Sequence, residues 1–359
     1  APMKAPAPWL FARPIDLLLG AGGLALPLAL VTPALVQGLG ARSTLLFPAL
    51  ALVCNYPHYF ATLHRAYRTR LERERYRLYT RDLTLLIAAT GALVMAFPVL
   101  LPAVFTAYLT WSPWHYSGQN YGIGLLFLRR QGAAPTRIEA RCLKLAFLTS
   151  SLIALTFAHR AGSRSEAFWS LELPASITPG LTGLLLCFHV GLAAVGLVGP
   201  SRRHGIRPML PVLLLLLAQG VWFTSFAVTL LAPGVSWAPR ALGMGDVALL
   251  HCAQYLWILA WFSRRESAET QAGRFWPRYT ALLIAGGIAL WLPIPWASSR
   301  LGGLDFCTTS EGHPRHRRRA RRRLRPARRP HRPARQRMAP SARCRTRRGR
   351  RCHAPQGRA

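Results

Sequence analysis

The sequence has very few acidic residues. Asp and Glu number 12 in 359 residues, and charged residues of both signs make up 16% of the chain, against 51% hydrophobic residues. That is too little polar surface to cover a soluble globule of this length. Lysine is nearly missing too, since Lys4 and Lys144 are the only two. The composition therefore argues against a soluble protein and indicates that much of the surface faces lipid.

Paired cysteines are also lacking. The sequence has no CxxC pair and no spacing typical of a zinc site, and four of its seven cysteines lie in or beside apolar segments. We expect them to behave as small buried apolar residues. The seven are Cys54, Cys142, Cys187, Cys252, Cys307, Cys344 and Cys352.

Apolar runs of about twenty residues recur along the first 300 residues. Each is close to the ~20 residues with which an α-helix crosses a ~30 Å hydrocarbon core. None alternates as a barrel strand does. The sequence predicts an all-α, polytopic transmembrane helix bundle over 15–300, preceded by a short segment, 1–14. The nine predicted spans are 15–38, 44–64, 83–100, 103–128, 144–159, 178–198, 209–231, 243–263 and 279–297.

Arginine is distributed unevenly among the loops between these spans. The arginine-rich loops are 65–81, 129–144, 199–207 and 264–278. The loops with at most two arginines are 39–43, 98–102, 160–177 and 232–242. The two kinds alternate strictly, as the positive-inside rule requires. This predicts a multi-pass protein of the bacterial inner membrane with a cytoplasmic N-terminus.

The C-terminal segment 301–359 has a different composition. It contains 20 arginines after residue 310 and no Phe, Tyr, Trp, Ile or Val after residue 306, so we expect it to be disordered. Such a tail suits RNA or anionic lipid. However, nine spans place it outside, against the positive-inside rule, and it lacks aromatic side chains for base stacking. These two points favour a frameshift product near residue 305 and argue against nucleic-acid binding.

Histidines inside the predicted spans are the main functional signal. They fall on four helices that run in the same direction, and imidazoles at such depth normally face the bundle interior. We predict that they form a metal site for iron, copper or zinc, which are among the metals that imidazole ligands suit. The four candidate ligands are His58, His115, His189 and His251.

Side chains that can form hydrogen bonds lie about one helical turn from three of these histidines. We expect them to orient the imidazoles, as outer partners of metal ligands do. They are Asn55 and Thr62 for His58, Gln119 for His115, and Gln254 and Tyr255 for His251. Possible carboxylate ligands are Asp16, Asp82 and Asp246. The same stripes equally suit hydrogen bonds between helices in a purely structural role.

Two further features of the fourth predicted span bear on the site. If Ser112 caps a helix that begins at Pro113, His115 moves toward the outer surface, too far from His58 to share a metal. Gly118 and Gly122 have the GxxxG spacing, which predicts close contact with another helix.

The segment Trp114-His115-Tyr116, in a chain of many helices with histidines inside its spans, resembles the bacterial membrane β-carotene dioxygenase family. The resemblance implies an iron held by intramembrane histidines and cleavage of a carotenoid. The sequence lacks the closely spaced histidine pair expected of that family, so neither substrate nor reaction is carried over. The leading hypothesis is a histidine-metal oxidoreductase acting on a lipid-soluble substrate. A transporter with histidines as proton or substrate sites, and a non-catalytic membrane subunit, are the alternatives.

Overall fold

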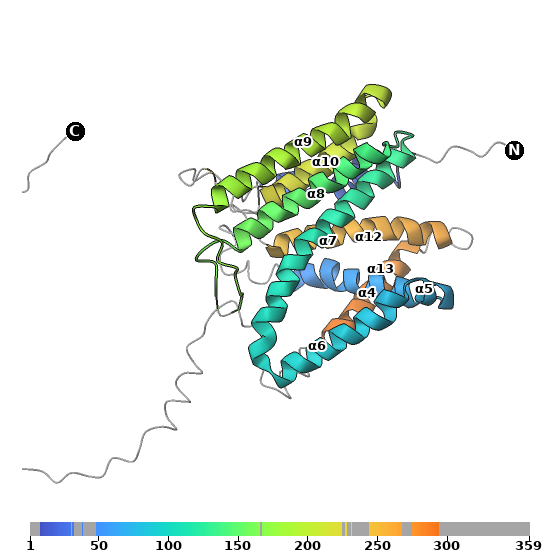
Figure 1. Ribbon diagram of the computed structural model, residues 1–359. Helices are drawn as coiled ribbons and strands as arrows, with labels where there is room; N and C mark the ends of the chain where they lie inside the picture. Colours follow the sequence, from blue (N-terminus) through green and yellow to red (C-terminus); the bar gives the residue numbers. More distant parts are fainter. Residues whose placement is uncertain are drawn as a thin grey trace, which may run out of the picture. The chain divides into compact units, whose positions relative to one another are not determined.

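The structure is a computed structural model, and its described part is all-α (Figure 1). It lies within a compact unit, Ala1–Thr309. The described residues are 8–29, 31, 38, 48–165, 167–224, 227, 231, 244–267 and 275–293. The predicted tail, 301–359, lies outside them.

The helices follow the predicted spans closely from residue 78 onward. At the start of the chain are α1 (Arg13–Ile15), the π-helical turn η1 (Asp16–Gly20), the π-helical turn η3 (Ala51–Asn55), α4 (Tyr56–Tyr67) and α5 (Arg70–Arg75). The middle of the chain forms η4 (Leu78–Leu83), α6 (Thr84–Ala96), η5 (Pro98–Leu100), α7 (Leu101–Arg130), α8 (Arg137–Ala158) and α9 (Thr178–His204). The rest comprises η6 (Arg207–Met209), α10 (Leu210–Gln219), η7 (Gly220–Thr224), α12 (Met244–Ser267) and α13 (Phe275–Trp291).

Among the described residues, four helices are long and apolar enough to cross a membrane. They are Leu78–Ala96, Arg137–Ala158, Thr178–His204 and Arg207–Thr224. They match the third, fifth, sixth and seventh predicted spans. Residues 30, 32–37 and 39–47 and the whole loop 232–242 lie outside the described residues, so nine spans remain a prediction.

The start of α8 is fixed by a capping box, and its interior hydroxyls are used locally. Thr136 caps the helix, with its side chain accepting from the Glu139 N–H while the Glu139 carboxylate accepts from the Thr136 N–H. Farther along, Ser150 and Thr156 donate to backbone carbonyls of the preceding turn. A helix rich in hydroxyls thus leaves few polar groups unsatisfied, as a membrane interior requires.

Glycines mark the close helix crossings, but they are not the predicted pair. Helices α8 and α9 run side by side (Figure 1). A Cβ at Gly196 of α9 would lie 2.6 Å from the Leu143 side chain of α8. On α13, a Cβ at Gly287 would lie 2.7 Å from the backbone of Tyr56, where α13 packs on α4. Within the described part of the chain, nothing lies within 4 Å of a Cβ placed at Gly118 or Gly122, so the predicted close contact is not formed there.

Helix α7 runs unbroken through Pro113. The alternative in which a helix begins at this proline is therefore wrong, and His115 lies in the middle of a 30-residue helix. Hydroxyls near the proline bond to carbonyls of the same helix: Ser112 Oγ donates to Tyr108 O and Ser117 Oγ donates to Pro113 O.

The described helices differ greatly in how much of their surface is buried. The largest core cluster brings together α7, α8, α10 and α12 around Phe127, Phe147 and Leu215. Half of the apolar windows of Arg137–Ala158 and Arg207–Thr224 is buried, but only 6% of that of Leu78–Ala96. Apolar side chains of α6, such as Leu86 and Ile87, are mostly exposed. This arrangement places α4, α7 and α12 around the candidate site and leaves α6 at the periphery.

Candidate metal centre

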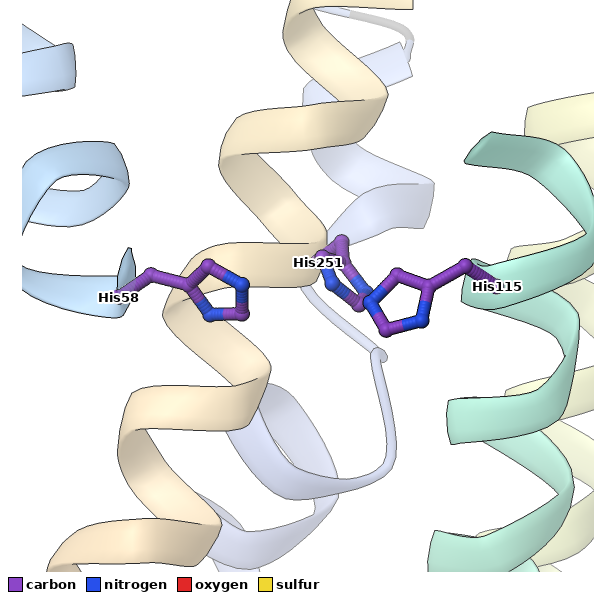
Figure 2. Close-up of side chains that lie close together, drawn as sticks. All are labelled: His58, His115 and His251. Atoms are coloured by element: carbon purple, nitrogen blue, oxygen red, sulfur yellow. The ribbon is translucent and has the colours of Figure 1, made fainter. Parts of the chain in front are cut away.

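Three of the four predicted ligands come together. His58 lies on α4, His115 on α7 and His251 on α12, and one ligand nitrogen from each lies within 4.8 Å of the others. Figure 2 shows the three imidazoles turned toward one another, with His251 between the other two. Among the described residues this is the group able to hold a metal ion.

The ring geometry shows a compact cluster. The centroid of the His251 ring lies 5.2 Å from that of His58 and 5.0 Å from that of His115. Metal–imidazole bonds of about 2.0–2.1 Å in tetrahedral geometry place ligand nitrogens roughly 3.4 Å apart. The observed separations are therefore within reach of small side-chain rotations.

Three of the ring nitrogens in this group lack hydrogen-bond partners. His251 is 1% exposed, and both of its ring nitrogens are buried without a hydrogen bond, as is Nδ1 of His58. A buried polar atom without a partner costs about 1–3 kcal/mol. Imidazole nitrogens from three helices that lie within 4.8 Å of one another are a donor set that a metal ion satisfies, so the residues fit a bound metal.

Two glutamines fix the position of α12 relative to its neighbours. Gln119 Nε2 on α7 donates to the backbone oxygen of His251, at 3.2 Å, and to Gln254 Oε1, at 3.1 Å. Gln254 Nε2 in turn donates to Gly20 O at the end of η1, at 3.0 Å. The pair therefore ties together three elements around His251. These contacts orient the helix that carries His251, whereas we expected contacts with the imidazole itself.

The predicted partners of His58 act in a similar way. Thr62 Oγ1 lies 3.0 Å from the backbone oxygen of His58 and 3.2 Å from Tyr255 OH. The Tyr255 ring packs edge-on against His58, with centroids 4.6 Å apart. Asn55 makes a different contact, in which its Oδ1 accepts from Cys252 Sγ, at 3.3 Å. Both sets of contacts join α4 or η3 to α12.

The fourth candidate ligand, His189, lies elsewhere. It is buried where α9 packs on α8, with Nδ1 2.8 Å from Ala146 O. Its position corresponds to a helix–helix contact. The structure does not bring it into the group formed by the other three histidines.

The proposed carboxylates are not part of the group either. Asp16 is fully buried, but Oδ2 accepts from the N–H groups of Leu10 and Phe11, and Oδ1 accepts from Trp257 Nε1. Asp82 forms an exposed ion pair with Arg81. The side chain of Asp246 lies outside the described part of the chain. The described donor set is therefore three imidazoles.

Aromatic side chains enclose the centre on two sides. The Tyr116 ring centroid lies 4.2 Å from that of His251, and Trp111 stacks on His115 at 4.7 Å with an angle of 13° between the planes. Tyr59 packs edge-on against His58 at 5.3 Å. These contacts depend on three helices meeting, which no local sequence pattern reveals.

A second buried polar group lies nearby on α7 and was missed by sequence analysis. Asn120 Nδ2 donates to Gln219 Oε1 of α10, and Gln219 Nε2 donates to Ser117 Oγ. All three residues are fully buried. The sequence feature that could have indicated this group is the Ser-x-x-Asn spacing in an apolar span, which places both side chains about one helical turn apart on the same face of the helix. We call this group the Gln219 network.

Comparisons with protein-family models, with curated proteins and with solved structures gave no match for this chain. The site is therefore interpreted from its own geometry.

Proposed function

We propose that this chain is an integral membrane, metal-dependent oxidoreductase that acts on a lipid-soluble substrate. The observation that carries the proposal is the buried group of His58, His115 and His251, in which three ring nitrogens have no hydrogen-bond partner. The presence of four helices long and apolar enough to cross a membrane supports the location.

Iron is the metal we favour, with copper or zinc as alternatives. Imidazole ligands suit all three, and iron or copper would supply the one-electron or oxygen chemistry of an oxidoreductase. Three protein ligands leave coordination positions for a reactant. The protein would hold the metal between α4, α7 and α12, while Gln119 and Gln254 keep the backbone of His251 in place.

The surroundings of the centre favour an apolar substrate. His115 is the partly exposed member of the group, and its neighbours Trp111 and Trp114 are half-exposed on the same stretch of α7. On another face of α12, a cavity of about 190 Å³ is lined almost entirely by apolar residues of η3, α4, α12 and α13, including Pro57 beside His58. A molecule dissolved in the bilayer would reach either place laterally.

Metal analysis of the purified full-length protein tests the proposal. We expect about one redox-active metal per chain, lost in His58→Ala, His115→Ala and His251→Ala but retained in His189→Ala. The His189 variant is the matched control, because it removes a buried imidazole from the same set of helices. Correctly folded protein without metal would contradict the proposal.

A turnover assay separates the enzyme from its alternatives. Oxygen uptake with membrane lipid extracts, and with carotenoids first because of the resemblance around His115, should occur only in metal-loaded protein. Proton movement in proteoliposomes that needs the histidines but no metal would instead identify a transporter. Metal binding with neither activity would indicate a structural subunit.

A further inference from the structure

The N-terminal segment 9–22 is built into the core beside α12. Leu10 and Ala21 belong to the largest core cluster, together with residues of α7, α8, α10 and α12. Gly20 approaches α7 closely, since a Cβ at this position would lie 3.1 Å from the Phe127 ring. The segment therefore packs against the helices of the core with little room to shift.

One buried carboxylate joins this segment to α12. Asp16 is the first residue of η1, and its Oδ2 accepts from the N–H groups of Leu10 and Phe11, at 2.7 and 3.1 Å. Its Oδ1 accepts from Trp257 Nε1 of α12, at 2.9 Å. Hydrogen bonds to a carboxylate are stronger than those between neutral groups. Asp16 thus fixes both the fold of the segment and its place against α12.

The other end of η1 holds α12 as well. Gly20 O accepts from Gln254 Nε2, at 3.0 Å. Gln254 Oε1 accepts in turn from Gln119 Nε2, which also donates to His251 O. His251, Gln254 and Trp257 follow one another at intervals of three residues, so they share one side of α12. The first and last residues of one short turn therefore fix the rotation of α12 about its axis and its position along that axis.

His251 is the ligand that depends most on this placement. Its ring lies between those of His58 and His115, with centroids 5.2 and 5.0 Å away (Figure 2). Each residue of an α-helix advances about 1.5 Å and turns about 100°. A small slip or rotation of α12 would therefore move the His251 imidazole away from the point that the other two share.

We propose that Asp16 is a positioning residue of the histidine centre. By holding Trp257, it keeps α12 in the rotation at which His251 faces His58 and His115. The carboxylate that sequence analysis offered as a metal ligand would thus act through the helix that carries one. The inference rests on the proposed function, because it assigns Asp16 a role at the same metal site. A purely structural Asp16 would affect stability alone, whereas a positioning residue also affects the coordination geometry.

Cobalt(II) binding to the metal-stripped full-length protein in detergent tests the inference, because the visible absorption of cobalt reports its coordination geometry. Asp16→Asn keeps the size of the side chain but leaves one acceptor oxygen in place of two. The affinity for cobalt should fall about fivefold, below the range of about 10–100-fold for groups bonded directly to a metal ligand. The absorption bands should shift as well.

Trp257→Phe removes only the bond between Asp16 and α12 and should have the same two effects. Because both variants break one connection, the double variant Asp16→Asn/Trp257→Phe should bind cobalt no more weakly than either single variant. Trp257→Phe also decides the question if Asp16→Asn does not fold. Additive losses in the double variant would contradict the shared connection.

The matched control is Glu139→Gln, which removes another buried carboxylate that accepts hydrogen bonds, at the start of α8. It should lower the thermal midpoint but leave the cobalt spectrum unchanged and the affinity within about twofold, since distant sites act independently. If Asp16→Asn and Trp257→Phe behave like this control, the positioning role is overturned while the metal site stands. A wild-type protein that binds no cobalt would overturn the proposed function, and this inference with it.

Discussion

The histidine centre and the Gln219 network are both buried polar groups that involve α7, yet their polar atoms are used differently. In the network, Gln219 accepts from Asn120 and donates to Ser117, which donates to Pro113 O. In the centre, three ring nitrogens of His58 and His251 have no partner. The network completes most of its own hydrogen bonds, with Asn120 Oδ1 as the exception. The three nitrogens of the centre could instead be satisfied by a bound metal ion.

The presence or absence of internal hydrogen-bond partners distinguishes a structural polar group from a ligand site more clearly than residue type does. Both groups are buried, and both join helices that are distant in the sequence. A polar group with internal partners stabilises helix packing, by about 0.6 kcal/mol per hydrogen bond on average in membrane proteins. A group of imidazoles without partners destabilises the fold until a ligand binds.

The largest effect should come from removing the central ligand. His251→Ala should lower metal affinity by about 100-fold or more, beyond the 10–100-fold range seen when only outer partners of ligands are removed. Metal content by mass spectrometry is the measurement. Gln219→Leu, in the network, is the control and should leave metal content unchanged. Equal metal content in both variants would erase the proposed difference between the two groups.

Chelation of the metal should have the next largest effect. A ligand that binds the folded state at 100 times its dissociation constant contributes about 2.7 kcal/mol to stability. Stripping the metal should therefore lower the thermal midpoint of the wild-type protein in detergent. The same treatment should leave His251→Ala unchanged. A midpoint that is insensitive to chelators in the wild type would argue that the buried nitrogens are tolerated without a ligand.

Breaking the Gln219 network should destabilise without affecting the metal. Gln219→Leu leaves Asn120 Nδ2 without its acceptor, and we expect a loss of about 1–2 kcal/mol in the free energy of unfolding. Denaturation followed by tryptophan fluorescence measures this loss. Gln219→Glu retains one acceptor oxygen for Asn120 and serves as a second comparison. A drop in metal content on Gln219→Leu would show that the two groups are coupled.

The smallest effect should come from the contact that lies between the two groups. Gln119→Leu removes the hydrogen bonds to His251 O and Gln254 Oε1, and should cost about 1 kcal/mol of stability. Because those bonds position α12, metal affinity should fall several-fold, less than for His251→Ala. Gln131→Leu, on the turn after α7, is a control at a distant site. A metal affinity equal to that of the wild type would show that the helix is positioned without Gln119.

The sequence predicts the helices from residue 78 onward well, because long apolar runs specify membrane helices directly. It also identifies the three histidines that meet, since intramembrane imidazoles tend to face the interior. Proline and glycine were harder to interpret. Pro113 lies inside α7 and does not begin a helix, and within the described part of the chain nothing lies within 4 Å of a Cβ placed at Gly118.

The remaining differences concern partners that are distant in the sequence. His189 has the same local features as the other histidines, but α9 packs on α8 and directs it to Ala146 O. The glutamines and Thr62 bond to backbone and to one another, where sequence spacing predicted contacts with imidazoles. Which side chain completes a buried hydrogen bond depends on how the helices are arranged, and periodicity within one helix does not determine it.

The exposed position of α6 has a consequence for membrane insertion during synthesis. The segments Leu78–Ala96 and Arg207–Thr224 have almost the same mean hydropathy, but 6% of the first and 50% of the second is buried. If the first segment crosses the membrane as we propose, it gains little from neighbouring helices, so its own side chains must supply the free energy with which the translocon releases it into lipid. A charge introduced at Ile87 would therefore reduce the fraction of newly made chains in which this segment inserts. The effect would come before the bundle folds.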